Sequence, residues 1–330
     1  MPIRYPPTVS LARTPTPIER LERLSRRLPV EVFVKRDDLT GCELTGNKVR
    51  KLEFLLAEAR SRGATVVITC GAAQSNHARA TAIAAARLGL QCRLLVRGRP
   101  DAANEGNLFL DRLVGAYLWF LTPEEWRQVD ARMDEEAARV AKEGGRPYVI
   151  PEGGSNALGS LGYARAMEEI AEWSASNGAV FAAIAHATGS GGTTAGLALG
   201  RAATGYPARV LGFAICDDEA TFRRQIDRIL GEARARFAPD VEVSSSDFEI
   251  VEGYKGAGYA RSRPEEIEFL REVAGEEGLI LDPVYTWKAF RGLLEEARRG
   301  RFPRGAKVLF VHTGGIFGLL AQRDSLGSAG

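Results

Sequence analysis

The sequence has few metal-ligating and thiol side chains. Among its 330 residues there are only three histidines and four cysteines, and no pair has the short spacing of a zinc site or a redox dithiol. The cysteines are Cys42, Cys70, Cys92 and Cys216. We therefore expect no metal site, and we interpret the cysteines as buried, reduced thiols.

The chain also lacks an excess of charge of one sign and any long apolar run. Its 44 basic and 42 acidic residues give a net charge of +2, which favours neither a nucleic acid nor a membrane surface as partner. Its apolar runs are too short, or too broken by charge, to span a bilayer. The start, Met1 to Pro7, has no signal-peptide pattern, so we expect a cytoplasmic protein.

What the chain does contain is an alternation of short β-branched runs and amphipathic helices. Strands are predicted at 65–70, 94–96, 117–121, 148–150, 180–185, 210–214 and 308–311. Helices are predicted at 49–62, 76–88, 124–142, 160–174, 193–203, 219–236, 264–277 and 286–299. This alternation is typical of α/β proteins with parallel sheets flanked by helices, whose ligands bind at the carboxyl ends of strands.

A first candidate site is Lys48, at a loop-to-helix junction beside Arg50 and Lys51. Neighbouring cations and the positive end of a helix disfavour an ammonium group, and a lysine with a lowered pKa is a nucleophile toward an aldehyde. The local pattern alone favours the alternative, an ordinary solvated basic helix start.

Two further candidates directly follow predicted strands. Gly71 to His77 combines polar side chains with good helix caps, and a capped helix start explains only part of that cluster. Gly189 to Thr193 is glycine-rich and precedes a helix, so its amides favour binding a phosphate over forming a plain turn. Weaker signals at 153–156, 282–286 and 312–315 are as typical of turns as of function.

Together these segments resemble one family, the pyridoxal-phosphate (PLP) enzymes of the tryptophan-synthase-β type. Within it they are similar to the branch of D-cysteine desulfhydrase and 1-aminocyclopropane-1-carboxylate (ACC) deaminase. The resemblance extends from about Pro15 to Leu319 and is carried by the strings at 36–39, 46–53, 74–77, 151–155 and 281–286.

The resemblance implies an α/β fold of two open, mostly parallel, twisted sheets, each flanked by helices, with the cofactor in the cleft between two domains. Residues 1–53 and 161–330 would form a large PLP-binding domain, and residues 54–160 a smaller inserted α/β domain. It also implies a homodimer acting on a small amino acid.

Roles for single residues also follow from the resemblance. Lys48 would hold PLP as a Schiff base and remove the Cα proton, Asn76 would bond the phenolic oxygen, and Thr286, with Thr313, would face the pyridine nitrogen. The phosphate would bind to Gly189, Ser190, Gly191, Gly192 and Thr193. The substrate side would be lined by Ser75, Tyr259 and Tyr285, with Asn47 and Gln74 positioning the carboxylate or the cofactor.

The implied reaction is α,β-elimination, in which PLP acts as the electron sink and a substituent leaves from Cβ. With D-cysteine, the substrate we expect, the products are pyruvate, sulfide and ammonia. A neutral hydroxyl at the ring nitrogen weakens the electron sink, which suits elimination better than more demanding carbanion chemistry.

Four positions bear on the substrate. ACC deaminases typically have Tyr-Glu where this chain has Tyr285-Thr286, which argues against ACC deamination. Trp287 replaces a small glycine and either narrows the pocket or packs as core. Arg261 and Arg263 replace a Pro-Asn segment; they either meet an anionic substituent, as in cysteate, or lie on the surface. Three alternatives stay open: an ACC deaminase, an L-cysteate sulfo-lyase and a non-catalytic PLP- or phosphate-binding protein.

Overall fold

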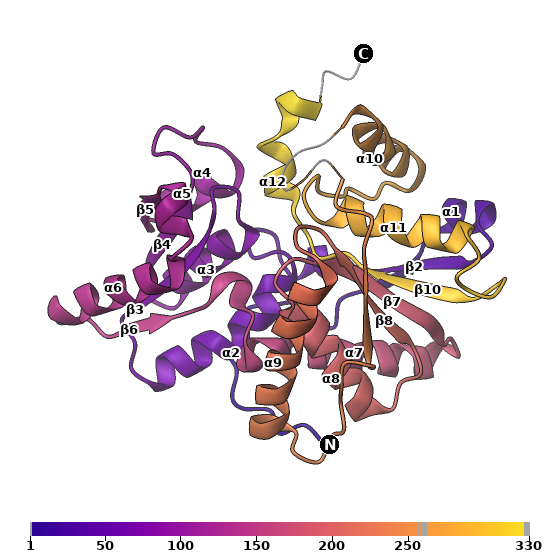
Figure 1. The fold of residues 1–330 in the computed structure, drawn as a ribbon, viewed down its shortest axis with the longest axis horizontal. Coiled ribbons are helices and arrows are strands. Elements are labelled where there is room, and N and C mark those ends of the chain that lie inside the picture. Colours follow the sequence, from indigo (N-terminus) through magenta and orange to yellow (C-terminus); the bar gives the residue numbers. More distant parts are fainter. Residues whose placement is uncertain (1, 257, 259–262, 327–330) are drawn as a thin grey trace.

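The computed structural model describes residues 2–256, 258 and 263–326, and it shows two β-sheets (Figure 1). The larger sheet has the strand order β1-β2-β10-β7-β8-β9. Its neighbours pair in parallel except β1 with β2. The strands are β1 (Ile18–Arg20), β2 (Glu31–Lys35), β7 (Phe181–Thr188), β8 (Arg209–Ala214), β9 (Phe248–Val251) and β10 (Lys307–Val311).

The smaller sheet is entirely parallel, with the order β5-β4-β3-β6. Its strands are β3 (Val66–Ala72), β4 (Gln91–Arg97), β5 (Tyr117–Leu121) and β6 (Pro147–Val149). Two mostly parallel sheets flanked by helices confirm the predicted fold class. The strands of the smaller sheet come from one continuous stretch of chain, while the exact domain boundaries stay a prediction.

Helices cover both sheets, and the two lobes they form lie side by side in Figure 1. Those of the smaller lobe are α3 (Asn76–Arg87), α4 (Gly106–Leu113), α5 (Pro123–Trp126) and α6 (Val129–Lys142). The others are α1 (Glu22–Arg27), α2 (Asn47–Ser61), α7 (Ala157–Asn177), α8 (Gly192–Thr204), α9 (Glu219–Phe237), α10 (Pro264–Glu277), α11 (Thr286–Arg298) and α12 (Ile316–Leu320). Short 3₁₀ turns lie at Asp37–Leu39, Glu152–Gly154 and Arg323–Leu326.

Helix α2 connects the two lobes, because its apolar face is buried in a core that includes residues of both sheets. Its side chain Arg50 is anchored by a buried ion pair to Asp37 at 2.8 Å and a second pair to Glu169 at 2.7 Å. Burial alone would raise the pKa of Asp37, but the Arg50 guanidinium lowers it to about 2. Removing one partner of such a buried pair costs about 3–5 kcal/mol, so this network fixes the position of α2.

Some elements differ from the sequence-based expectation. Strands β1, β2 and β9 and helices α1, α4 and α12 were not predicted, since each is short. The predicted helix 124–142 is interrupted at Arg127 and Gln128, where Gln128 leaves the helical conformation with a φ of −118° and a ψ of 29°; the short helix α5 precedes this break and α6 follows it. Cys42 is exposed, which corrects the expectation that all four thiols are buried.

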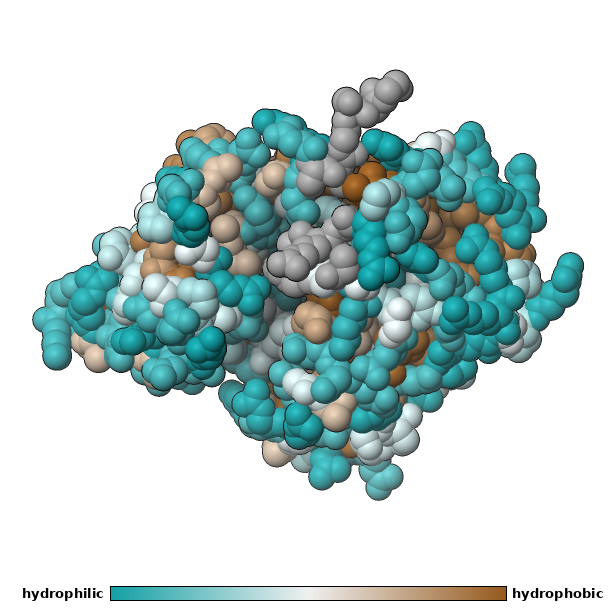
Figure 2. Space-filling view, turned by 45° about the horizontal axis from the view of Figure 1, so that its top comes forward, coloured by the Kyte–Doolittle hydropathy of each residue, from teal (hydrophilic) through white to brown (hydrophobic). Residues whose placement is uncertain are grey.

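Within the described part of the chain, no helix is both long and apolar enough to cross a membrane. The same residues contain no cluster of three or more His, Cys, Asp or Glu side chains arranged to hold a metal ion. The face drawn in Figure 2 is largely hydrophilic, with apolar side chains scattered over it and a hollow between the lobes.

Candidate active site

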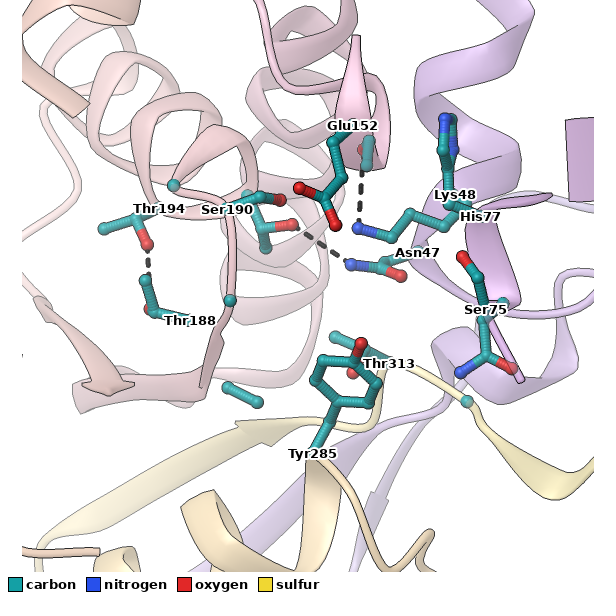
Figure 3. Close-up of a pocket in the computed structure, with 17 residues that line it drawn as sticks. Asn47, Lys48, Ser75, His77, Glu152, Thr188, Ser190, Thr194, Tyr285 and Thr313 are labelled. Carbon is teal, nitrogen blue, oxygen red and sulfur yellow. Dashed lines mark hydrogen bonds between the residues drawn. The ribbon is translucent and has the colours of Figure 1, made fainter. Parts of the chain in front are cut away.

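A cleft with roughly 690 Å³ of empty space lies where the two lobes meet. The lining comes from the start of α2 and from loops that follow β3, β6, β7 and β10, as expected for parallel sheets. Figure 3 shows Lys48 and Ser75 on one side, Thr188 and Thr194 on the opposite side, and Tyr285 below.

Lys48 lies in the first turn of α2, and its Nζ is 3.4 Å from the carbonyl oxygen of Gly153. The amine faces the cleft but is enclosed by protein, and this loss of hydration lowers its pKa to about 8, although the Glu152 carboxylate opposes the shift. The lowered pKa of Lys48 agrees with the prediction, but its physical cause differs from the predicted one. Arg50 is neutralised in its own ion pairs, so burial replaces neighbouring cations as the reason.

The start of α2 is fixed by a close approach of two backbones. The Asn47 amide donates to the Thr313 carbonyl at 3.2 Å. Gly46 has a φ of 96°, and a Cβ there would lie 2.6 Å from the same oxygen. Only glycine fits at this point. Asn47 then donates from Nδ2 to Thr193 Oγ1 at 3.2 Å, which connects the helix carrying Lys48 to the glycine-rich loop.

The loop from Gly189 to Thr193 lies between β7 and α8, where the amides of a helix N-terminus are available to an anion. Its backbone is tightly enclosed, because a Cβ on Gly192 would lie 2.7 Å from Ser155 Oγ and 2.8 Å from Lys51 Nζ. Ser190 Oγ is 2.8 Å from Ser155 Oγ. The loop therefore offers a narrow, donor-rich site of the kind a phosphate group requires.

Lys51 is a site residue that sequence reasoning missed. It was considered only as a cation next to Lys48, although a spacing of three places both side chains on one face of a helix. It is buried and donates to the Gly153 carbonyl at 3.3 Å and to Ser155 Oγ at 3.0 Å. Burial, together with the charge of Lys48, lowers the pKa of Lys51 far below its usual value. An anion beside Gly192 would stabilise its protonated form.

Two of the predicted residues come from the start of α3. Ser75 caps the helix by accepting from the Ala78 amide at 3.2 Å, and its hydroxyl lines the cleft. Asn76 also lines the cleft, and its Oδ1 accepts from Asn107 Nδ2 at 3.1 Å. The cap is therefore real, and the same loop also presents polar groups to the cavity.

The structure does not bring every predicted residue to the cleft. Gln74 donates to the Glu105 carbonyl at 3.0 Å and accepts from the Asn107 amide at 2.9 Å, so its side chain connects to α4. Thr286 is buried, and its hydroxyl bonds to Asp282 at 2.7 Å, away from the cleft lining. Thr313 lines the cleft and Thr286 does not, so the hydroxyl beside the pyridine nitrogen stays a prediction for Thr313 alone. Tyr259 lies outside the described residues.

The other three positions that raised questions about the substrate are mostly remote from the cleft. Trp287 is only 1% exposed, packs in the core under the larger sheet and donates to the Pro283 carbonyl at 2.7 Å. It therefore does not narrow the pocket. The Arg263 amide bonds to Glu266 at the start of α10, and this arginine does not line the cleft. Arg261 lies outside the described residues.

Glu152 is a second residue that sequence reasoning left without a role. It lines the mouth of the cleft and is exposed, and in Figure 3 its carboxylate extends toward the Lys48 amine. Partial loss of hydration raises the pKa of this carboxyl above its usual value, although the positive charges of Arg97 and Lys48 oppose the shift. The sequence analysis identified the motif at 151–155, but the sequence alone does not indicate the direction of the Glu152 side chain within it.

Taken together, a lysine with a lowered pKa, an anion-binding loop and an amide donor in a cleft between two parallel sheets define an α/β enzyme suited to a phosphorylated aldehyde cofactor. The family model for pyridoxal-phosphate dependent enzymes matches residues 9–314, and the chain belongs to this family. The predicted cofactor is thereby confirmed, and the arrangement of the cleft fits it.

Relatives within the family carry two activities in their names. The chain is 45% identical to a putative 1-aminocyclopropane-1-carboxylate deaminase of Thermotoga maritima, over 96% of this chain and 99% of that one. It is 43% identical to a mitochondrial bifunctional D-cysteine desulfhydrase/1-aminocyclopropane-1-carboxylate deaminase of Arabidopsis thaliana. That match covers 97% of this chain and 81% of the relative. The solved structure of an ACC deaminase homologue, 41% identical in sequence, superimposes with a TM-score of 0.90. The superposition covers 97% of this chain and 95% of that one. The predicted branch of the family is confirmed.

Proposed function

We propose that this enzyme eliminates the β-substituent of D-cysteine, converting D-cysteine and water to pyruvate, hydrogen sulfide and ammonia. The observation that carries the proposal is the Lys48 amine, which faces the cleft with a pKa of about 8 between the Ser75 hydroxyl and the glycine-rich loop. The relative with both activities in its name supports this reaction type.

In this proposal the cofactor is held at four places. Lys48 would hold it as a Schiff base, the amides of Gly189 to Thr193 would bind the phosphate with help from Lys51, Asn76 would donate to the phenolic oxygen, and Thr313 would face the pyridine nitrogen. When bound, PLP supplies the electron sink that stabilises negative charge at Cα. The neutral hydroxyl of Thr313 leaves the ring nitrogen unprotonated, which suits elimination.

The side chains of this protein then position the substrate and move its protons. The Ser75 hydroxyl and the Asn47 side-chain amide would bind the substrate carboxylate, and the Lys48 amine would take the Cα proton. Tyr285 lies across the cleft from Ser75 (Figure 3), and in this proposal it would face the departing β-substituent. Tyr259 keeps its proposed role on the substrate side by resemblance alone.

ACC deamination is the second candidate, because the similar relatives and the superimposed structure carry that name. Thr286 remains an argument against it by resemblance. Cysteate is disfavoured, since Glu152 at the mouth of the cleft repels a sulfonate and Arg263 does not line it. A non-catalytic binding protein is disfavoured, because it would not need a reactive amine at Lys48 or a hydroxyl at Ser75 in the cleft. By resemblance we further propose a cytoplasmic homodimer.

Two measurements test the proposal. Borohydride treatment of the yellow protein, followed by peptide mapping, should place a covalent adduct on Lys48; a colourless protein without an adduct would refute the cofactor assignment. Keto-acid release should then be assayed with D- and L-cysteine, ACC, L-cysteate, β-chloroalanine and serine. We expect D-cysteine to give the highest kcat/KM, and a higher value with ACC would replace our proposal by the second candidate.

A further inference from the structure

Behind Asn76 lies a buried chain of hydrogen bonds that leads away from the cleft. Arg79 Nε donates to Asn107 Oδ1 at 3.0 Å, and Asn107 Nδ2 donates to Asn76 Oδ1 at 3.1 Å. Asn107 Nδ2 also donates to the Gln74 carbonyl at 3.0 Å. Arg79 and Asn107 are both 0% exposed, so water does not compete for these groups.

The chain has only one possible direction. A guanidinium has donors and no acceptor, so Asn107 must turn its oxygen toward Arg79 and its NH₂ group toward Asn76. Asn76 must then turn its own oxygen toward Asn107. Its NH₂ group is left for the cleft that its side chain lines. Arg79 therefore determines, through two amides, that Asn76 presents a donor to the ligand.

Arg79 itself is held from both lobes. It donates to the backbone carbonyls of Glu43 and Thr45, the latter at 3.0 Å, just before α2 begins. Its guanidinium also lies over the ring of Phe317 in α12 at 5.2 Å. Burial lowers the pKa of Arg79 to about 10, which leaves the side chain protonated at neutral pH, so its role as a donor is permanent.

We propose that Arg79 and Asn107 are positioning residues that fix Asn76 as a hydrogen-bond donor to the phenolic oxygen of the cofactor. The inference rests on the proposed role of Asn76. A donor at this oxygen stabilises its ionised form, and with it the long-wavelength colour of the cofactor bound to Lys48. If the two residues served only to pack α3 against α4, their polarity would not affect that colour.

The test is Asn107→Asp, which keeps size and shape. Its carboxylate still accepts from Arg79 but has no donor for Asn76, so the Asn76 amide reverses and turns its oxygen toward the cleft. We expect the long-wavelength band at neutral pH to decrease in favour of a near-ultraviolet band, and PLP to bind about 10-fold more weakly. Asn177→Asp, on the exposed end of α7, is the matched control and should change neither.

The outcomes separate this inference from the proposed function. A folded Asn107→Asp protein with an unchanged spectrum and PLP affinity would overturn the inference, while a borohydride adduct on Lys48 would still support the cofactor site. If Asn107→Asp does not fold, Asn107→Ala replaces it. Its loss of orientation should shift the spectrum in the same direction but less, and an unchanged spectrum there would also refute the positioning role.

Discussion

The two walls of the cleft are built in different ways. The glycine wall, Gly189 to Thr193, is formed mainly by backbone amides at one strand-helix junction. The amide wall, Ser75 and Asn76, presents side chains whose directions depend on Asn107 and Arg79. The glycine wall should therefore be sensitive to added volume, and the amide wall to a change of polarity at constant volume.

The largest expected effect concerns Lys48, on the helix that joins the two walls. Lys48→Ala removes the amine proposed both to form the Schiff base and to act as the base, so turnover should decrease by about 10³-fold or more. The fold should persist, as measured by circular dichroism and thermal melting. Lys142→Ala, on the distant helix α6, is the control. Activity near the wild-type level in Lys48→Ala would contradict the assignment.

Next in size is the pH dependence of PLP capture by the apoprotein. Only the neutral amine attacks the aldehyde, and burial lowers the pKa of Lys48 to about 8. The capture rate should therefore rise about 10-fold per pH unit below pH 8 and level off above it. Stopped-flow absorbance measures it. A rate still rising steeply through pH 10 would indicate a lysine with an ordinary pKa.

At the glycine wall, Gly192→Ala tests the sensitivity to volume. The added Cβ would lie within 2.8 Å of Ser155 Oγ and Lys51 Nζ, so PLP should bind about 10- to 100-fold more weakly. Equilibrium titration by absorbance gives the dissociation constant. Gly231→Ala, in the exposed middle of α9 with no atom within 4 Å of the new Cβ, is the matched control. Equal affinity in both variants would argue against a tight phosphate loop.

At the amide wall, Ser75→Ala removes one hydroxyl with little change of volume. Turnover should decrease by about 5- to 10-fold through the lost hydrogen bond to substrate, with a smaller change in PLP affinity. The variant also loses a helix cap, which costs about 1 kcal/mol of stability. Thr122→Ala loses a cap far from the cleft and controls for this. Equal losses of turnover and affinity would make Ser75 a cofactor residue instead.

The smallest expected effect is at the mouth between the walls. Glu152→Gln removes the exposed carboxylate, so kcat/KM for L-cysteate should rise by about two- to fivefold. The value for D-cysteine, which has no anionic sulfonate, should change less. Steady-state assays with both substrates measure the ratio, and Glu124→Gln on the surface is the control. A decrease with L-cysteate would show that Glu152 acts in another way.

Much of the fold could be predicted from the sequence because long periodic segments carry strong signals. The alternation of strands and helices predicted parallel sheets flanked by helices, and the two mostly parallel sheets of the structure confirm it. Short elements such as β1 and α12 escaped prediction, although β6, which is as short as β1, was predicted from its apolar run. The break at Gln128 between α5 and α6 also escaped prediction, because the apolar spacing continues through it.

In the cleft, the residues adjacent to strand ends were predicted better than those placed by long-range contacts. Asn47, Lys48, Ser75, Asn76 and the Gly189 to Thr193 loop were named in advance, and the structure brings them together. Thr286 was misplaced, because its local bonds to Asp282 cannot be distinguished from a functional hydroxyl in the sequence. Lys51 and Asn107 were missed, since their partners are about a hundred and about thirty residues away.

The sequence by itself therefore determined the fold class and the cofactor, because motifs of contiguous residues specify backbone loops and helix starts. It also proposed Lys48 as the residue that would hold the cofactor. Only the tertiary structure decided why that lysine is reactive and which way Asn76 faces. Burial lowers the Lys48 pKa, and the donor-only guanidinium of Arg79 orients the amides. Both effects depend on atoms that meet only after the two lobes pack together.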